Sequence, residues 1–164
     1  AALSKSAIQN YAEYEQMVGG VETLFKDSGD LVKKYADNAY ESAGLSANEY
    51  MNTVTSFSAR LLQGLGDDTK TAADIANTAV VDMADNANKM GTSMESIQNA
   101  YQGFAKQNYT MLDNLKLGYG GTASEMARLI NDSGVLGDSI EVTAKTVNDV
   151  SFDKMIEAIH VIQT

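Results

Sequence analysis

The side chains best suited to acid–base or metal chemistry are scarce in this sequence. His160 is the only histidine, and cysteine is absent. A single imidazole cannot form a His–His or His–Cys metal pair, and no Ser-His-Asp arrangement is recognisable around it. Because His160 follows Ile156 and Ile159 in an apolar stretch, we predict that its role is structural.

Two pairs of neighbouring carboxylates are the next acid–base candidates. Glu13 lies two residues before Glu15, and Asp67 directly precedes Asp68. Paired carboxylates transfer protons when their surroundings separate their pKa values, but an acidic chain places many such groups on solvated helix faces. With 22 Asp and Glu against 12 Lys and Arg, we predict surface positions. We therefore expect no catalytic residue, no cofactor-binding residue, no metal ligand and no enzyme activity.

Two glycine-containing segments share some features with ligand-binding loops. Gly118-Tyr119-Gly120-Gly121 precedes a helix start, where an anion could bind, but it lacks the Lys-Ser/Thr ending of a P-loop and the spacing of a dinucleotide fingerprint. Asp27-Ser28-Gly29-Asp30 lacks the alternating oxygen ligands and the terminal Glu of a calcium loop. We predict that both segments are turns between helices.

Aromatic residues near a lysine could stack on the bases of a single-stranded nucleic acid. Tyr101, Phe104 and Tyr109 surround Lys106 in this way. The formal net charge of −10 opposes binding to phosphate backbones and to anionic lipids. Since Tyr101 and Phe104 also fall on the apolar face of a predicted helix, we expect core or partner contacts and no direct nucleic-acid binding.

The composition favours a folded, helical protein. A hydrophobic content of 44% over 164 residues is sufficient for the core of one domain, and proline, the strongest helix breaker, is absent. No apolar run approaches the roughly 20 residues of a membrane span. The chain begins Ala1-Ala2-Leu3-Ser4, without an initiator Met or a basic leader, so we expect an internal segment of a longer protein.

Helix-start signals recur along the chain. Residues 46–49, 92–95 and 122–125 have the Ser/Thr-x-x-Glu pattern of a capping box, and Ser151 precedes a last apolar stripe. Glycines such as Gly19-Gly20 and Gly44 fall where an apolar period stops. The stripes are Leu3, Ala7, Ile8, Tyr11 and Val18; Leu31, Val32, Tyr35, Ala36, Ala39 and Ala43; Tyr50, Val54, Phe57 and Leu61; Met94, Ile97, Tyr101 and Phe104; Met126, Leu129 and Ile130; and Phe152, Met155, Ile156, Ile159 and Ile162.

The clearest predicted helix spans residues 69–90 and has a narrow apolar face of mostly small side chains. That face consists of Ala72, Ile75, Ala76, Ala79, Met83, Ala87 and Met90. Small side chains permit close helix approach. We therefore expect this face to support lengthwise packing with other copies of the chain.

We predict an all-α fold: several amphipathic helices joined by short Gly-containing turns, as a helical bundle or as elongated helical hairpins. Residues 1–164 form a single helical segment in this prediction. Ala36-Asp37-Asn38-Ala39 returns as Ala84-Asp85-Asn86-Ala87, each followed by a glycine and a capping box. This weak echo of a helix-turn-helix suggests sub-units 1–64 and 67–134, followed by a linker and helix at 135–164.

One long stretch resembles a known family. The run NANKMGTSMESIQNAYQGFAKQNYTMLDNLKLGYGGT, residues 86–122, resembles tail tape measure proteins of phages and prophages from low-GC Gram-positive bacteria. Residues 11–16, 19–25, 36–40, 44–57 and 156–164 look similar too, so the resemblance covers most of the chain. The departures are Ala127, where relatives often have Gln, and residues 131–150, where Gly134 and Gly137 interrupt a usually more continuous, charged helix.

The resemblance implies a structural role in a phage tail. Tape measure proteins set tail length during assembly, fill the tail lumen and leave ahead of the genome to assist its delivery. The implied partners are other tape measure copies, the tail tube, the tail assembly chaperone and distal tail proteins. The implied locations are the virion tail lumen and, during assembly, the bacterial host cytoplasm. No catalytic motif of the family has a counterpart in these residues.

Two other functions stay open at this point. The chain could be a helical protein–protein interaction module of prophage origin, which should copurify with a defined partner. It could instead belong to a tail-associated muralytic enzyme, since some members of the family carry peptidoglycan-cleaving domains elsewhere.

Overall fold

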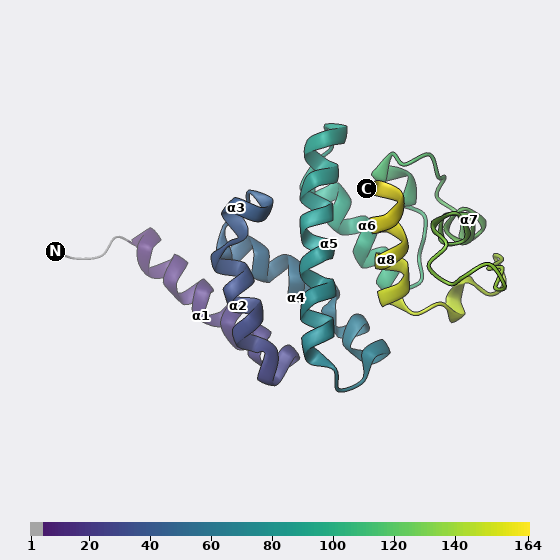
Figure 1. The fold of residues 1–164 in the computed structure, drawn as a ribbon. Helices are drawn as coiled ribbons and strands as arrows, with labels where there is room; N and C mark the ends of the chain where they lie inside the picture. Colours follow the sequence, from purple (N-terminus) through teal and green to yellow (C-terminus); the bar gives the residue numbers. More distant parts are fainter. Residues whose placement is uncertain (1–4) are drawn as a thin grey trace.

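The computed structural model describes residues 5–164, which form an all-α bundle without a strand (Figure 1). This confirms the predicted fold class and its bundle alternative. Leu3 and the side chain of Ala7, from the first predicted stripe, lie outside what is described. The helices are α1 (Lys5–Phe25), α2 (Gly29–Asp37), α3 (Ala39–Ala43), α4 (Ala47–Leu65), α5 (Thr69–Met90), α6 (Met94–Ala105), α7 (Ala123–Ser133) and α8 (Phe152–Gln163), with short 3-10 turns at Lys26–Ser28, Leu112–Leu115 and Val147–Asp149.

Helix α5 lies at the centre of the bundle and packs against α2, α4, α6 and α8. Its bounds match the prediction, and Gly91 ends it in the left-handed conformation with φ +70°. The prediction of one narrow apolar face is wrong, because Ala73, Val80 and Asp82 are buried on other sides as well. Neighbouring helices of the same chain cover the alanine face, so it is not available to another copy.

The hydrophobic core runs without a break from Val21 in α1 to Ile159 in α8. The rings of Phe57 and Phe152 meet edge to face at 6.2 Å between centroids and join α4 to α8. The C-terminal helix is therefore anchored in the same core as the N-terminal half.

Helix α1 differs from its prediction. It continues through Gly19-Gly20 to Phe25, since Val21 and Phe25 are fully buried and their packing outweighs the low helix propensity of glycine. Its first turns project beyond the other helices (Figure 1), which leaves Ile8 54% and Tyr11 64% exposed. The first predicted apolar stripe is thus not part of the core at these two positions.

The predicted helix starts are correct with small shifts. The hydroxyls of Ser46 and Thr122 accept hydrogen bonds from the backbone N–H three residues later, as a capping residue does. In the 92–95 segment the cap is Ser93 rather than Thr92, whose hydroxyl is buried. Ser151 occupies the N-cap position of α8, but its side chain makes no capping hydrogen bond.

The segment between α7 and α8 is mostly irregular. Gly134 ends α7 with φ +73°, as expected from the interruption seen in the sequence. The side chain of Asn131 holds the segment in place: its amide donates to the Val142 carbonyl and its carbonyl accepts from the Val142 N–H, both at 2.8 Å. Two hydrogen bonds at one residue fix the path of this loop against the end of α7.

No helix in residues 5–164 is both long and apolar enough to cross a membrane.

Candidate functional site

His160 and Asp82 form a partly buried acid–imidazole pair between α8 and α5. The imidazole Nδ1 lies 2.9 Å from Oδ2 and 3.1 Å from Oδ1 of the carboxylate. The Asp82 side chain is 4% exposed, whereas that of His160 is 43% exposed. An imidazole held through Nδ1 has Nε2 as its second site for a proton or a hydrogen bond.

Further hydrogen bonds extend this pair along the two helices. The amide of Gln163 donates to the Asp82 carbonyl at 2.8 Å, and the amide of Asn86 donates to the Leu115 carbonyl at 2.9 Å and to Oε1 of Gln163 at 3.3 Å. These contacts tie α5, α8 and the turn after α6 together. The cluster defined by Asp82, Asn86, His160 and Gln163 is called the α5–α8 polar cluster below.

The carboxylate of Asp82 is set in a partly apolar environment. Burial raises its pKa, and the hydrogen bond with His160 opposes that rise. The hydroxyl of Tyr101 on α6 is buried without a hydrogen-bond partner among the described residues, and burial together with the nearby Asp82 charge raises the pKa of this phenol. Asp82 and Asn86 are therefore shielded from solvent, whereas His160 and Gln163 are partly exposed.

The imidazole of this cluster can hold and exchange a proton at its exposed edge. A hollow of about 170 Å³ adjoins His160 and is lined by Ile75, Thr78 and Ile156 together with two acidic side chains, Asp153 and Glu157. Within residues 5–164, no group of three His, Cys, Asp or Glu side chains is arranged to hold a metal ion. The contact between the His160 imidazole and Asp82 links α8 to α5, as a structural role for His160 requires.

Asp82 was not singled out by the sequence. The sequence nevertheless gives a weak indication that Asp82 is buried. Asp82 lies two residues after Val80 and directly before Met83, and both of these apolar residues are buried in the central helix. A carboxylate within such an apolar stretch requires a partner, and His160 supplies it.

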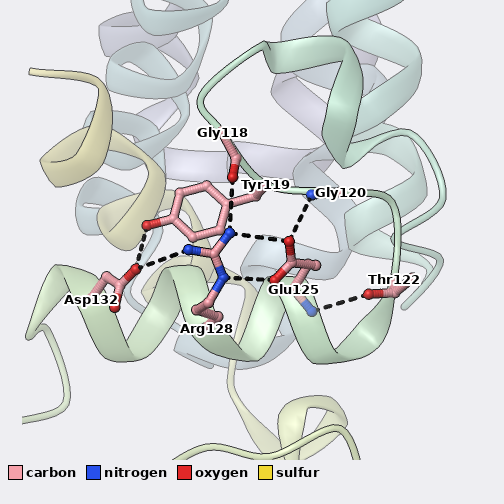
Figure 2. A network of polar contacts seen from close by, with 7 residues as sticks. All are labelled: Gly118, Tyr119, Gly120, Thr122, Glu125, Arg128 and Asp132. Carbon is pink, nitrogen blue, oxygen red and sulfur yellow. Dashed lines mark hydrogen bonds and ion pairs between the residues drawn. The ribbon is translucent and has the colours of Figure 1, made fainter.

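The glycine-rich turn at residues 118–121 is closed by the chain's own charged side chains (Figure 2). Oε1 of Glu125 accepts a hydrogen bond from the Gly120 N–H at 3.1 Å, and Nη2 of Arg128 donates to the Gly118 carbonyl at 2.8 Å. The Arg128 guanidinium also pairs with Glu125 at 2.6 Å and lies 4.1 Å from the centre of the Tyr119 ring. The predicted turn is thus present.

This network occupies one backbone donor at which an anion could bind. The Gly120 N–H points at the Glu125 carboxylate, whose pKa falls to about 2, chiefly through Arg128 and then through this backbone bond. Tyr119 completes the network by donating its hydroxyl proton to Asp132 at 2.6 Å. The arrangement stabilises a turn and the start of α7, and a phosphate would have to displace Glu125.

The remaining acidic candidates occupy ordinary helix positions. Asp68 caps α5 by accepting from the Thr71 N–H and hydroxyl, which lowers the pKa of this carboxyl. Asp67 is exposed, as are Glu13 and Glu15 on α1. In the 27–30 segment, Asp30 forms a 3.0 Å ion pair with Lys33 on α2.

The aromatic residues near Lys106 lie in the core, as predicted for two of them. Tyr101 and Phe104 are 1% exposed and Tyr109 is 5% exposed. Their rings follow one another at 5.7 Å and 6.4 Å between centroids, and Tyr109 donates to the side-chain carbonyl of Asn148 at 2.7 Å. Buried rings cannot serve as stacking platforms for bases.

No protein-family model, no curated protein and no solved structure matches this chain.

Proposed function

We propose that this chain is a folded structural module of a phage or prophage tail tape measure protein. The observation that supports this proposal most is where the family-like run, residues 86–122, lies in the fold. The run contributes the end of α5, all of α6, the Leu112–Leu115 turn and the glycine turn. Six of its large apolar residues are buried in the core, namely Ile97, Tyr101, Phe104, Tyr109, Leu112 and Leu115, whereas Met111 is 42% exposed.

The glycines of the run support the same interpretation. A Cβ added at Gly103 would lie 2.9 Å from the Asn108 carbonyl oxygen, and one at Gly121 would clash with that of Thr110. Both positions require glycine because two backbone segments approach closely there. The pattern that resembles the family is therefore a set of residues that determine packing, as expected for an assembly protein.

The charge of the module suits a protein that shares a narrow tube with DNA. With a net charge of −10, its surface repels the phosphate backbone and favours separation from the genome. In this proposal the module occupies the lumen during assembly and leaves without adhering to the DNA.

The proposal is tested by duplicating residues 1–164 in frame in the parent gene and measuring tail lengths by electron microscopy. A folded module adds about 40 Å, the diameter that follows from compact packing of 164 residues. The same residues drawn out as one continuous helix add about 250 Å. Either increase supports a length-setting role, and its size tells whether the module stays folded in the lumen.

Unchanged tail length in the duplicated strain, with the longer protein present in the tails, would contradict the proposal. The interaction-module alternative would then be preferred, since the projecting first turns of α1 with exposed Ile8 and Tyr11 favour it. Duplication of such a module adds a binding site and no length.

A further inference from the structure

The first part of α1 is held in place by few contacts. Among the described side chains of residues 5–18, those of Tyr14, Met17 and Val18 are partly buried and the others are exposed. The Asn48 amide of α4 donates to the Asn10 carbonyl at 3.5 Å, which is long for a hydrogen bond. Residues 5–18 are called the α1 arm below, and the outer turns of this arm project beyond the other helices (Figure 1).

The second part of the same helix is anchored in the bundle. Val21 and Phe25 are fully buried, and the Glu22 carboxylate forms a 3.1 Å ion pair with Lys33 of α2. The boundary between the weakly held part and the firmly held part of α1 therefore falls at Gly19-Gly20.

The two glycines make this boundary a weak point of the helix. Each glycine is roughly two- to fivefold less favourable than alanine inside a helix, because it loses more backbone entropy. The first turn of α1 adds to the weakness, since it contains Lys5 and no acidic residue at the end where the helix dipole favours negative charge. An isolated helix shorter than roughly 12–15 residues is marginal in water, so the α1 arm depends on its contacts with α4.

Those contacts lie on either side of a buried methionine. The helix α1 meets α4 at Asn48, through the Asn10 carbonyl, and at Thr55, whose methyl carbon would lie 4.0 Å from a Cβ built at Gly20. Met51 comes three residues after Asn48 and four before Thr55, so it shares one side of α4 with both. Met51 is fully buried, which places it beneath the α1 arm.

We propose that the α1 arm is a strap that opens at Gly19-Gly20 while the rest of the bundle stays folded, and that its opening uncovers Met51. Opening separates the partly buried side chains of the arm from α4, whereas unfolding of the bundle must expose the whole core, so the open strap is the more populated state of the two. This conformational device goes beyond the proposed function and does not depend on it.

Thiol labelling under native conditions tests the proposal, because the chain contains no cysteine and a single introduced thiol reports its own exposure. Met51→Cys places the thiol beneath the strap. Met83→Cys is the comparison, since Met83 is fully buried on the central helix and adjoins Asp82, which α8 contacts. Urea unfolding of each variant measures its global stability and therefore the labelling rate that global unfolding alone would give.

The thiol at position 51 should react at least tenfold faster than its own global unfolding allows, and its rate should change little at low urea concentrations. The thiol at position 83 should react at the global unfolding limit, and its rate should rise steeply with urea. Hydrogen exchange of the wild-type chain gives a second measurement: peptides within residues 9–18 should exchange faster than peptides that contain Val21 and Phe25.

Replacement of the glycines tests the position of the hinge. Gly19→Ala with Gly20→Ala, in the Met51→Cys chain, should slow labelling roughly 5- to 25-fold, which is the combined effect of two glycines on helix stability. The matched control is Gly64→Ala, because Gly64 also lies inside a helix and its Cβ would meet Asp153 at an ordinary 3.6 Å. This control should leave the labelling rate at position 51 unchanged.

A thiol at position 51 that reacts no faster than global unfolding allows would overturn the inference. So would a labelling rate that is the same with glycine and with alanine at positions 19 and 20. Neither result bears on the tape measure proposal, since tail length is measured in the parent protein and does not depend on the strap.

Discussion

The imidazole Nδ1 of His160 lies 2.9 Å from Oδ2 of Asp82, and this pair joins the C-terminal helix to the central helix across 78 positions of the sequence. Because the carboxylate is almost fully buried, removal of the imidazole leaves it without its strongest partner. We predict that His160→Ala lowers the free energy of unfolding at neutral pH by about 1–3 kcal/mol.

Urea unfolding followed by circular dichroism measures this effect. His160→Asn is the matched control, because the Asn amide can donate to Asp82 from nearly the position of Nδ1. It should retain most of the stability. A His160→Ala variant as stable as the wild type would show that the pair makes no net contribution to holding α8.

A second prediction concerns the close approach at Gly121. An added methyl group would clash with the Thr110 carbonyl oxygen, so the backbone must shift. We predict that Gly121→Ala lowers the free energy of unfolding by about 1–3 kcal/mol, as overpacking does. Gly120→Ala is the control, since its Cβ would meet Glu125 at an ordinary 3.7 Å. Equal effects of the two substitutions in thermal unfolding would argue against this packing.

A third prediction has the opposite sign. Gly19 lies within α1 with open space around it. Alanine there should raise the free energy of unfolding by roughly 0.5–1 kcal/mol, because it loses less backbone entropy in a helix. Gly66→Ala should lower stability instead, since Gly66 has φ +62°. Denaturant midpoints of the two variants measure both changes in stability. A Gly19→Ala variant less stable than the wild type would mean that α1 is interrupted at the glycines.

The pKa of Glu125 gives a prediction for acid stability. Its folded-state value of about 2 lies below the ordinary 4.5, so the ion pair with Arg128 stabilises the fold fully above pH 4.5 and is lost as pH falls through about 2. The wild type should therefore exceed Glu125→Gln in stability at neutral pH, and the difference should shrink across this window.

Unfolding experiments at several pH values measure this difference. The same substitution at the exposed Glu13 serves as control. The difference in the free energy of unfolding between wild type and Glu125→Gln should not stay constant from pH 6 to about 2. A constant difference would show that the ion pair with Arg128 is not its origin.

The features that the sequence predicts correctly are those determined by residues close to one another in the chain. Helix 69–90 was correct at both ends because Gly91 and the apolar period lie within a few residues of the bonds that they control. The caps at Ser46 and Thr122 are equally local. The fold class follows from such signals, because three capping segments in one proline-free chain leave little room for another class.

Long-range relationships were not predictable in the same way. The tetrapeptide at residues 36–39 ends α2 at Asn38, whereas its copy at 84–87 lies inside α5, where Asn86 donates to the Leu115 carbonyl. The same letters have different structures because each copy packs against different distant residues, although Ala36, Ala39 and Ala87 are all buried. The burial of α5 on several sides and its pairing with His160 depend on the same kind of distant contact.

A prediction from charge also remains to be tested. With a net charge of −10, the purified chain should show no retention on double-stranded DNA at physiological salt. Electrophoretic mobility shifts measure this directly. Binding that weakens steeply with added salt would reveal a basic surface and would contradict the proposed separation from the genome.

The central claim is that these residues fold by themselves into a compact helical module. Small-angle X-ray scattering coupled to size-exclusion chromatography and light scattering, at low micromolar concentration, tests it most directly. We predict a monomer whose radius of gyration is about 15 Å, or slightly more because α1 projects. An elongated particle with a radius near 70 Å, the value for about 250 Å of continuous helix, would contradict the compact fold.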